Sequence, residues 1–118
     1  MAIKKVTKDL VNLKINQAAV YLTITVGNYQ IGASSVQFED SPDPITKGKV
    51  LQFPLGAKEA LSGKKLKIIT TVLDSNTDTN NISVTIGFQG TTSEPIVIHD
   101  TVDNEGDYYA LTTEYKFQ

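Results

Sequence analysis

The stretch Asn81-Ile82-Ser83-Val84-Thr85-Ile86-Gly87-Phe88 places an apolar residue at every second position. This is the period of a β-strand that has one face buried and the other face in water. The same alternation returns in Val20-Leu22-Ile24-Val26 and in Tyr109-Leu111-Thr113-Tyr115-Phe117. Strands with one apolar face each bury those faces by stacking as two sheets or by closing into a barrel. The sequence therefore predicts an all-β domain.

The chain has 118 residues and no cysteine. This length is sufficient for one domain whose two-layer core needs no disulfide bonds. The alternating segments amount to about eight strands, with one short helical turn at Ala57 to Leu61 and no helix between strands. Because parallel neighbours need a long crossover connection, we expect antiparallel pairing. We predict a single domain over residues 1–118, a two-layer antiparallel β-sandwich of jelly-roll, C2-like or immunoglobulin-like topology.

The dipeptide Gly27-Asn28 follows the predicted strand Ala19 to Val26 and has the residue types of a two-residue hairpin turn. Pairing across this turn would set Ile24 opposite Ile31 on one face, so we expect the two flanking strands to form a hairpin. The small residues Gly32 to Ser35 are expected to interrupt the second strand as a bulge or a bend.

The predicted core consists of the apolar residues that share the period of two: Val20, Leu22, Ile24, Val26, Ile82, Val84, Ile86, Leu111 and Phe117. Tyr109 and Tyr115 lie on the same face of their strand. The last strand, Tyr108 to Phe117, is long and contains no proline. An unpaired edge strand offers free N–H and C=O groups to another chain. We expect self-association through this strand or through the N-terminal segment, unless the last strand lies inside its sheet.

The charges argue against nucleic-acid binding. Every basic residue is Lys, and no Lys occurs between Ile68 and Tyr115, where eight acidic residues fall. The absence of Arg removes the side chain that best reads phosphates and guanine edges. The acidic second half of the chain would also repel a phosphate backbone. We therefore expect no nucleic-acid partner.

The sequence offers no recognisable catalytic set. His99 is the only histidine, and strand alternation turns it away from the face that holds Ile98. The next residue, Asp100, is expected to point to the other face again. A triad needs a nucleophile and an orienting carboxylate beside the base, and no serine here has the sequence of a nucleophile elbow. We expect that the protein is not an enzyme.

One loop resembles a calcium site in its spacing. Oxygen-bearing side chains occupy alternate positions of this loop: Asp74, Asn76, Asp78 and Asn80. Ca²⁺ takes six to eight such oxygen ligands. An EF-hand loop, however, requires Gly where Thr79 stands and a bidentate Glu where Thr85 stands. Because the same residue types also build ordinary turns, we expect a loop that binds Ca²⁺ weakly or not at all, and no other cofactor.

A second polar cluster contains Asp100, Asp103 and Asp107, within which residues 103–106 predict a type I turn. Loops of a sandwich gather at two ends, and the sequence leaves open whether the two clusters share one end. A shared end would suggest calcium-dependent binding of a sugar or a lipid headgroup. Tyr21 and Tyr108 alternate outward and are the candidate contact aromatics.

Two functions fit these patterns. The favoured one is a non-catalytic interaction or structural protein, a self-associating subunit of a larger assembly. The alternative is a loop-based module that binds carbohydrate or membrane, with or without calcium. No segment is long enough to span a bilayer, and Met1 to Asp9 lacks the apolar stretch of a signal peptide. A cytoplasmic protein or an assembly component is the default expectation, although a removed signal peptide would leave the same sequence.

Overall fold

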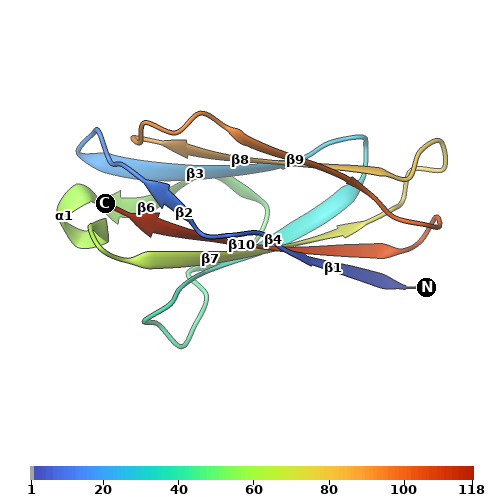
Figure 1. Ribbon diagram of the computed structural model, residues 1–118, viewed down its shortest axis with the longest axis horizontal. Helices are drawn as coiled ribbons and strands as arrows, with labels where there is room; N and C mark the ends of the chain where they lie inside the picture. The colour runs from blue at the N-terminus through green and yellow to red at the C-terminus, as the bar shows by residue number, and fades with distance from the viewer. Residues whose placement is uncertain (1) are drawn as a thin grey trace.

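The structure, a computed structural model, describes residues 2–118 as two stacked β-sheets (Figure 1). The described chain forms these elements: β1 (Ile3–Thr7), β2 (Val11–Leu13), β3 (Ala19–Val26), β4 (Ile31–Phe38), β5 (Thr46–Gly48), β6 (Val50–Ala57), α1 (Lys58–Leu61), β7 (Lys65–Leu73), β8 (Asn81–Gln89), β9 (Ile96–Thr101) and β10 (Tyr108–Phe117). The six-stranded sheet has the order β1-β10-β7-β4-β5, with β2 also paired to β10. The four-stranded sheet has the order β6-β3-β8-β9. The predicted all-β, sandwich-like architecture is confirmed, while the choice among the three topologies stays a prediction.

Buried and outward-facing side chains alternate along the central strands, and the buried ones form the core. Along β8 and β10 every second residue is buried. Of the predicted core residues, Ile24 and Val26 are half-buried against the core, and the others are fully buried. Phe88 packs edge-on against Tyr115, with ring centroids 4.7 Å apart. Each such buried side chain contributes about 1.5–3 kcal/mol, so a one-residue slip of β8 would be strongly destabilising.

The predicted hairpin between β3 and β4 is wrong, because these strands lie in different sheets. β3 pairs with β6 and β8, whereas β4 pairs with β5 and β7. The connecting turn has positive φ at Asn28 and Tyr29, and the N–H of Gln30 donates to the carbonyl of Gly27 at 3.2 Å. Matching apolar faces suit strands that face each other across a core as well as strands that pair side by side. The pattern alone did not separate the two cases.

The expected interruption of β4 at Gly32 to Ser35 is also wrong, because β4 runs unbroken from Ile31 to Phe38. Gly32 allows a close approach between the sheets, since a Cβ at this position would lie 2.5 Å from Cγ2 of Val26. Ser34 is buried, and its hydroxyl forms a 2.8 Å hydrogen bond with the hydroxyl of Thr70 on β7. The small residues serve packing between the layers and do not break the strand.

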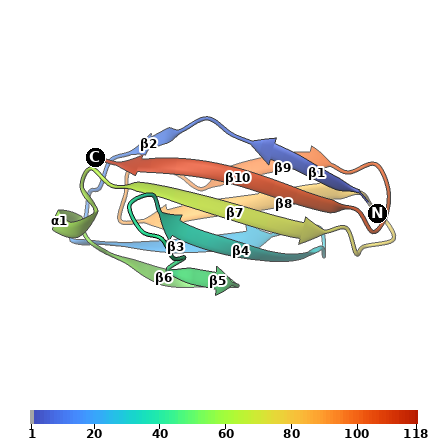
Figure 2. The same ribbon diagram turned by 90° about the horizontal axis from the view of Figure 1, so that it is seen from below.

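Antiparallel pairing holds except at the edge formed by the N-terminal strands. β1 and β2 both pair in parallel with β10 (Figure 2). β1 and β2 are the first strands of the chain and β10 is the last, so no short loop forces them to be antiparallel. The pairing also places β10 inside its sheet, between β1 and β2 on one side and β7 on the other. The last strand is therefore not the free edge that we expected, whereas β1 is an edge strand.

Candidate functional site

The two polar clusters of the sequence lie at the same end of the sandwich (Figure 1). The β7–β8 loop spans residues 74–80, and the β9–β10 loop spans residues 102–107. The N–H of Gly106 donates to the carbonyl of Asp74 at 2.9 Å, and the N–H of Val102 donates to that of Asn80 at 3.1 Å. We call this end of the molecule, together with the β3–β4 turn, the loop end. The question that the sequence left open is settled, since the clusters share one end.

Gln30 forms the centre of the loop end. Its side chain is buried, and its Nε2 atom donates to Oδ1 of the buried Asp74 at 2.7 Å and to the carbonyl of Thr79 at 3.2 Å. Its Oε1 atom accepts the N–H groups of Ser75 and Asn76, each at 2.8 Å. One glutamine thus satisfies donors and acceptors along the whole β7–β8 loop. The sequence analysis missed Gln30, because a single Gln beside a turn has no distinctive pattern.

The predicted calcium ligands Asp74, Asn76 and Asn80 form hydrogen bonds within the loop end. Oδ1 of Asn76 accepts the N–H of Asp78 at 3.0 Å, and Nδ2 of Asn80 donates to the carbonyl of Asp103 at 3.3 Å. The carboxylate of Asp107 accepts the N–H groups of Ala2 and Asn104, at 3.0 and 3.1 Å. The local hydrogen bonds among these, from Asp78 to Asn76 and from Asn104 to Asp107, are typical of turn-forming residues.

The carboxylates of Asp78 and Asp103 are exposed, and one oxygen of Asp74 has no hydrogen-bond partner within residues 2–118. The same residues contain no group of three His, Asp or Glu side chains arranged to hold a metal ion. Weak calcium binding at this loop stays a prediction.

Asp100 closes the side of the sandwich rather than joining the loop cluster. Nζ of Lys4 on β1 donates to Oδ1 of Asp100 on β9 at 2.7 Å and to the carbonyl of Thr101 at 2.9 Å. The hydrogen bond from Lys4 holds the pKa of Asp100 below its ordinary value. Tyr109 is buried nearby, and its burial, reinforced by the negative charge of Asp100, raises the pKa of its hydroxyl. These groups link the edges of the two sheets.

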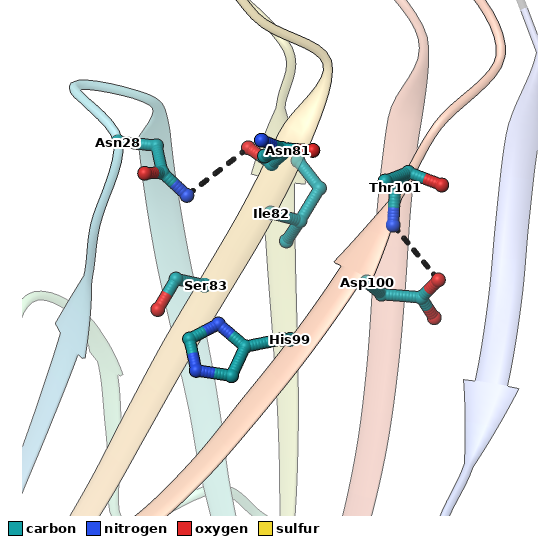
Figure 3. A pocket seen from close by; sticks show the side chains of 7 residues that line it. All are labelled: Asn28, Asn81, Ile82, Ser83, His99, Asp100 and Thr101. Carbon is teal, nitrogen blue, oxygen red and sulfur yellow. Dashed lines mark hydrogen bonds between the residues drawn. The ribbon is translucent and has the colours of Figure 1, made fainter.

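A shallow pocket of about 490 Å³ lies beside the loop end, over β8 and β9. Figure 3 shows the imidazole of His99 next to Ser83, its cross-strand partner, while the carboxylate of Asp100 turns away from both. Asp100 accepts the N–H of Thr101 at 2.8 Å. Asn28 donates to the carbonyl of Asn81 at 3.4 Å across the pocket mouth. The arrangement lacks the series of hydrogen bonds from carboxylate to imidazole to hydroxyl that a triad uses.

The two candidate aromatics lie on opposite faces and form no common site. Tyr21 is exposed on the outer face of the four-stranded sheet, and Tyr108 is half-buried on the outer face of the six-stranded sheet. The sequence analysis missed Tyr29, which is 93% exposed at the β3–β4 turn, and Leu51 of β6, which is 78% exposed. Leu51 breaks the alternation of apolar and polar residues in its strand, and this break is visible in the sequence.

The outer face of the six-stranded sheet carries one row of large apolar side chains across four strands. Register pairs Ile3 of β1 with Tyr108 of β10, Tyr108 with Leu73 of β7, and Leu73 with Ile31 of β4. Ile3 and Ile31, at the two ends, are 60% and 64% exposed. We call these four residues the apolar row. They became visible as a group only when the strand order was known.

Comparison of the chain with protein-family models, with curated proteins and with solved structures finds no match. No helix within residues 2–118 combines the length and the apolar character needed to cross a membrane.

Proposed function

We propose that this chain is a non-catalytic interaction or structural protein that self-associates through the outer face of its six-stranded sheet. The observation that supports this proposal is the apolar row, which places two largely exposed isoleucines in line with a tyrosine and a leucine. Contiguous exposed apolar surface on a folded domain is typical of protein–protein contacts. The proposal keeps the N-terminal strand in the contact but moves the contact from a sheet edge to a sheet face.

A second copy of the chain is the partner that this surface suits best. On β10, β7 and β4 the neighbouring positions of the same face are the small uncharged residues Ala110, Thr71 and Ala33. The charged pair Glu114 and Lys67 lies further along the strands, away from the row. A two-fold symmetric contact packs one patch against the same patch of the partner. The apolar row itself carries no charge, although Lys5 of β1 borders it beside Ala110, and homodimer interfaces are richer in apolar surface than other contacts.

The test is the mass of the protein in solution, measured by light scattering over a range of concentrations. We expect a mass above the 12.9 kDa of one chain, and we expect Ile31→Lys to shift the protein to the monomer. Val97→Lys is the matched control, because Val97 is an exposed apolar residue on the other sheet. A monomeric wild-type chain at every concentration would contradict the proposal, as would dissociation by Val97→Lys alone.

A further inference from the structure

The outer face of the four-stranded sheet has a hollow of about 460 Å³ on the side of the β8–β9 loop. The residues that line it come from three strands and from the loop before β9: Thr23, Thr25, Leu51, Gln52, Thr85, Gly87, Phe88, Gln89, Ser93 and Pro95. Gly87 pairs with Thr23 on β3. On its other side it has no partner in β9, because β9 begins at Ile96, which pairs with Ile86. The hollow therefore opens where a central strand has a glycine and its outer neighbour has not yet begun.

The backbone does not require glycine at position 87. Its φ lies outside the left-handed region, and a Cβ added there would meet only the carbonyl oxygen of Thr23, at 3.9 Å. Glycine inside a strand lowers stability by roughly 0.5–1 kcal/mol relative to Ala. In such a position it often marks a place where a ligand or another backbone approaches closely. Gly87 thus leaves space on the surface that the fold itself does not use.

The wall of the hollow is built by an irregular segment of β6. Gln52 has a φ of +47°, a conformation that is rare for a residue with a side chain. The N–H of Gln52 donates to Oγ1 of Thr23 at 3.0 Å, and the register between β3 and β6 shifts at this point. Strained residues and bulges of this kind are concentrated at binding sites, where they redirect side chains. Here the bulge places Leu51 and Gln52 beside the hollow.

The hollow contains no ionisable side chain, and Asp100 is the only Asp, Glu or Lys in the described strands of this sheet. Its polar groups are hydroxyls of Thr and Ser and amides of Gln, and its apolar groups are Leu51, Phe88 and Pro95. A sugar ring presents hydroxyls at its edge and C–H groups on its faces, which is the same combination. We infer that the hollow binds a neutral carbohydrate, with Gln52, Thr85 and Gln89 as hydrogen-bonding residues and Leu51 as the apolar contact.

This site lies on the face opposite the apolar row, so it is independent of the proposed self-association. The loop end takes no part in this site, and the proposal does not involve calcium. An uncharged peptide is the other class of ligand that the lining would accept. The lining offers side-chain hydroxyl and amide groups, which favours a sugar, because a peptide that binds at a sheet edge relies chiefly on main-chain hydrogen bonds.

The experiment is binding to immobilised neutral hexasaccharides of glucose, mannose, xylose and N-acetylglucosamine, with an acidic polygalacturonate and an uncharged peptide alongside. We expect the wild-type chain to bind one or more of the neutral saccharides. Gly87→Val, which fills the hollow with a residue suited to strands, is expected to weaken binding about tenfold or more. Thr85→Val is expected to weaken the same binding by removing one hydroxyl.

Thr101→Val, on the outer face of β9 but outside the hollow, is the control and is expected to bind like the wild type. Folding of each variant is checked by its far-UV spectrum and thermal melt. The inference is overturned if no neutral saccharide binds, if Gly87→Val binds as well as the wild type, or if the peptide or the acidic polymer binds instead. A failure here leaves the oligomeric state, and hence the proposed function, untouched.

Discussion

The loop end and the outer face of the four-stranded sheet are both polar, but they use their polar groups differently. At the loop end, Gln30, Asn76 and Asp107 direct their side chains to groups of their own chain. On the sheet face, Thr25, Thr85 and Gln89 line a hollow that the fold leaves open. The loop end is richer in acidic residues, so the sequence pointed to it as the candidate binding site. The sheet face gathers free hydroxyl and amide groups around one hollow, whereas the loop end leaves the carboxylates of Asp78 and Asp103 exposed.

The difference teaches that the number of polar residues in a segment is a poor guide to a binding site. A donor or acceptor that is already satisfied within the protein has little to offer a ligand, because exchanging one hydrogen bond for another gains little free energy. A site needs unsatisfied groups that solvent also reaches. Substitutions that remove or add a single group test the two sides of this distinction.

The largest effect is expected from Gln30→Ala, which removes every hydrogen bond that the Gln30 side chain makes to the β7–β8 loop. The buried carboxylate of Asp74 would then lose the partner that its Oδ1 atom has. We expect the free energy of unfolding to fall by about 3 kcal/mol, because buried groups left without partners are costly. Urea unfolding at pH 7 measures this change.

Gln37→Ala is the matched control, since Gln37 on β4 is half-buried and donates one hydrogen bond, to the carbonyl of Ser41 at 2.8 Å. We expect it to cost less than about 1 kcal/mol. Equal effects of the two substitutions would show that the loop end does not depend on Gln30.

A smaller effect, confined to high pH, is expected from the core tyrosines. The hydroxyls of Tyr109 and Tyr115 are buried and have no hydrogen-bond partner within the described residues. Burial raises the pKa of Tyr115 from 10.0 to about 12, although the neighbouring Thr113 opposes this shift in part. Above pH 10 the unfolded tyrosine loses its proton while the folded one keeps it. Stability is therefore complete below pH 10 and falls by roughly 1.4 kcal/mol per pH unit up to pH 12.

Tyr115→Phe is expected to match the wild type at pH 7 and to exceed it in stability at pH 11, as measured by urea unfolding at both pH values. Tyr29→Phe, at an exposed position, is expected to change neither value. If Tyr115→Phe destabilises the protein at pH 7, its hydroxyl has a partner. The Tyr115 hydroxyl would then not be an example of a polar group that is unpaired because neither the protein nor solvent reaches it.

The sequence predicted the features that depend on local period. The bounds of β3 and β10, the buried faces of β8 and β10, and the short helix after β6 all follow from alternation and composition. The features that depend on strand order were not predictable in this way. The β3–β4 connection between sheets, the parallel pairing of β1, and the apolar row all require contacts between distant segments. Gly87 was visible in the sequence, but its role depends on the empty space above it.

The most direct test of the account is the stability of Gly87→Ala, with Gly90→Ala as its control on the same stretch of chain. Gly90 has a φ of +93°, and a Cβ there would collide with the carbonyl oxygen of Ala19, whereas Gly87 has neither restriction. We predict that Gly87→Ala leaves the free energy of unfolding unchanged or raises it by up to about 1 kcal/mol. Gly90→Ala is expected to lose at least roughly 1–2 kcal/mol from the left-handed φ alone. A loss at Gly87 as large as that at Gly90 would contradict the account, because the glycine of the hollow would then be required by the fold and would not be left free for a ligand.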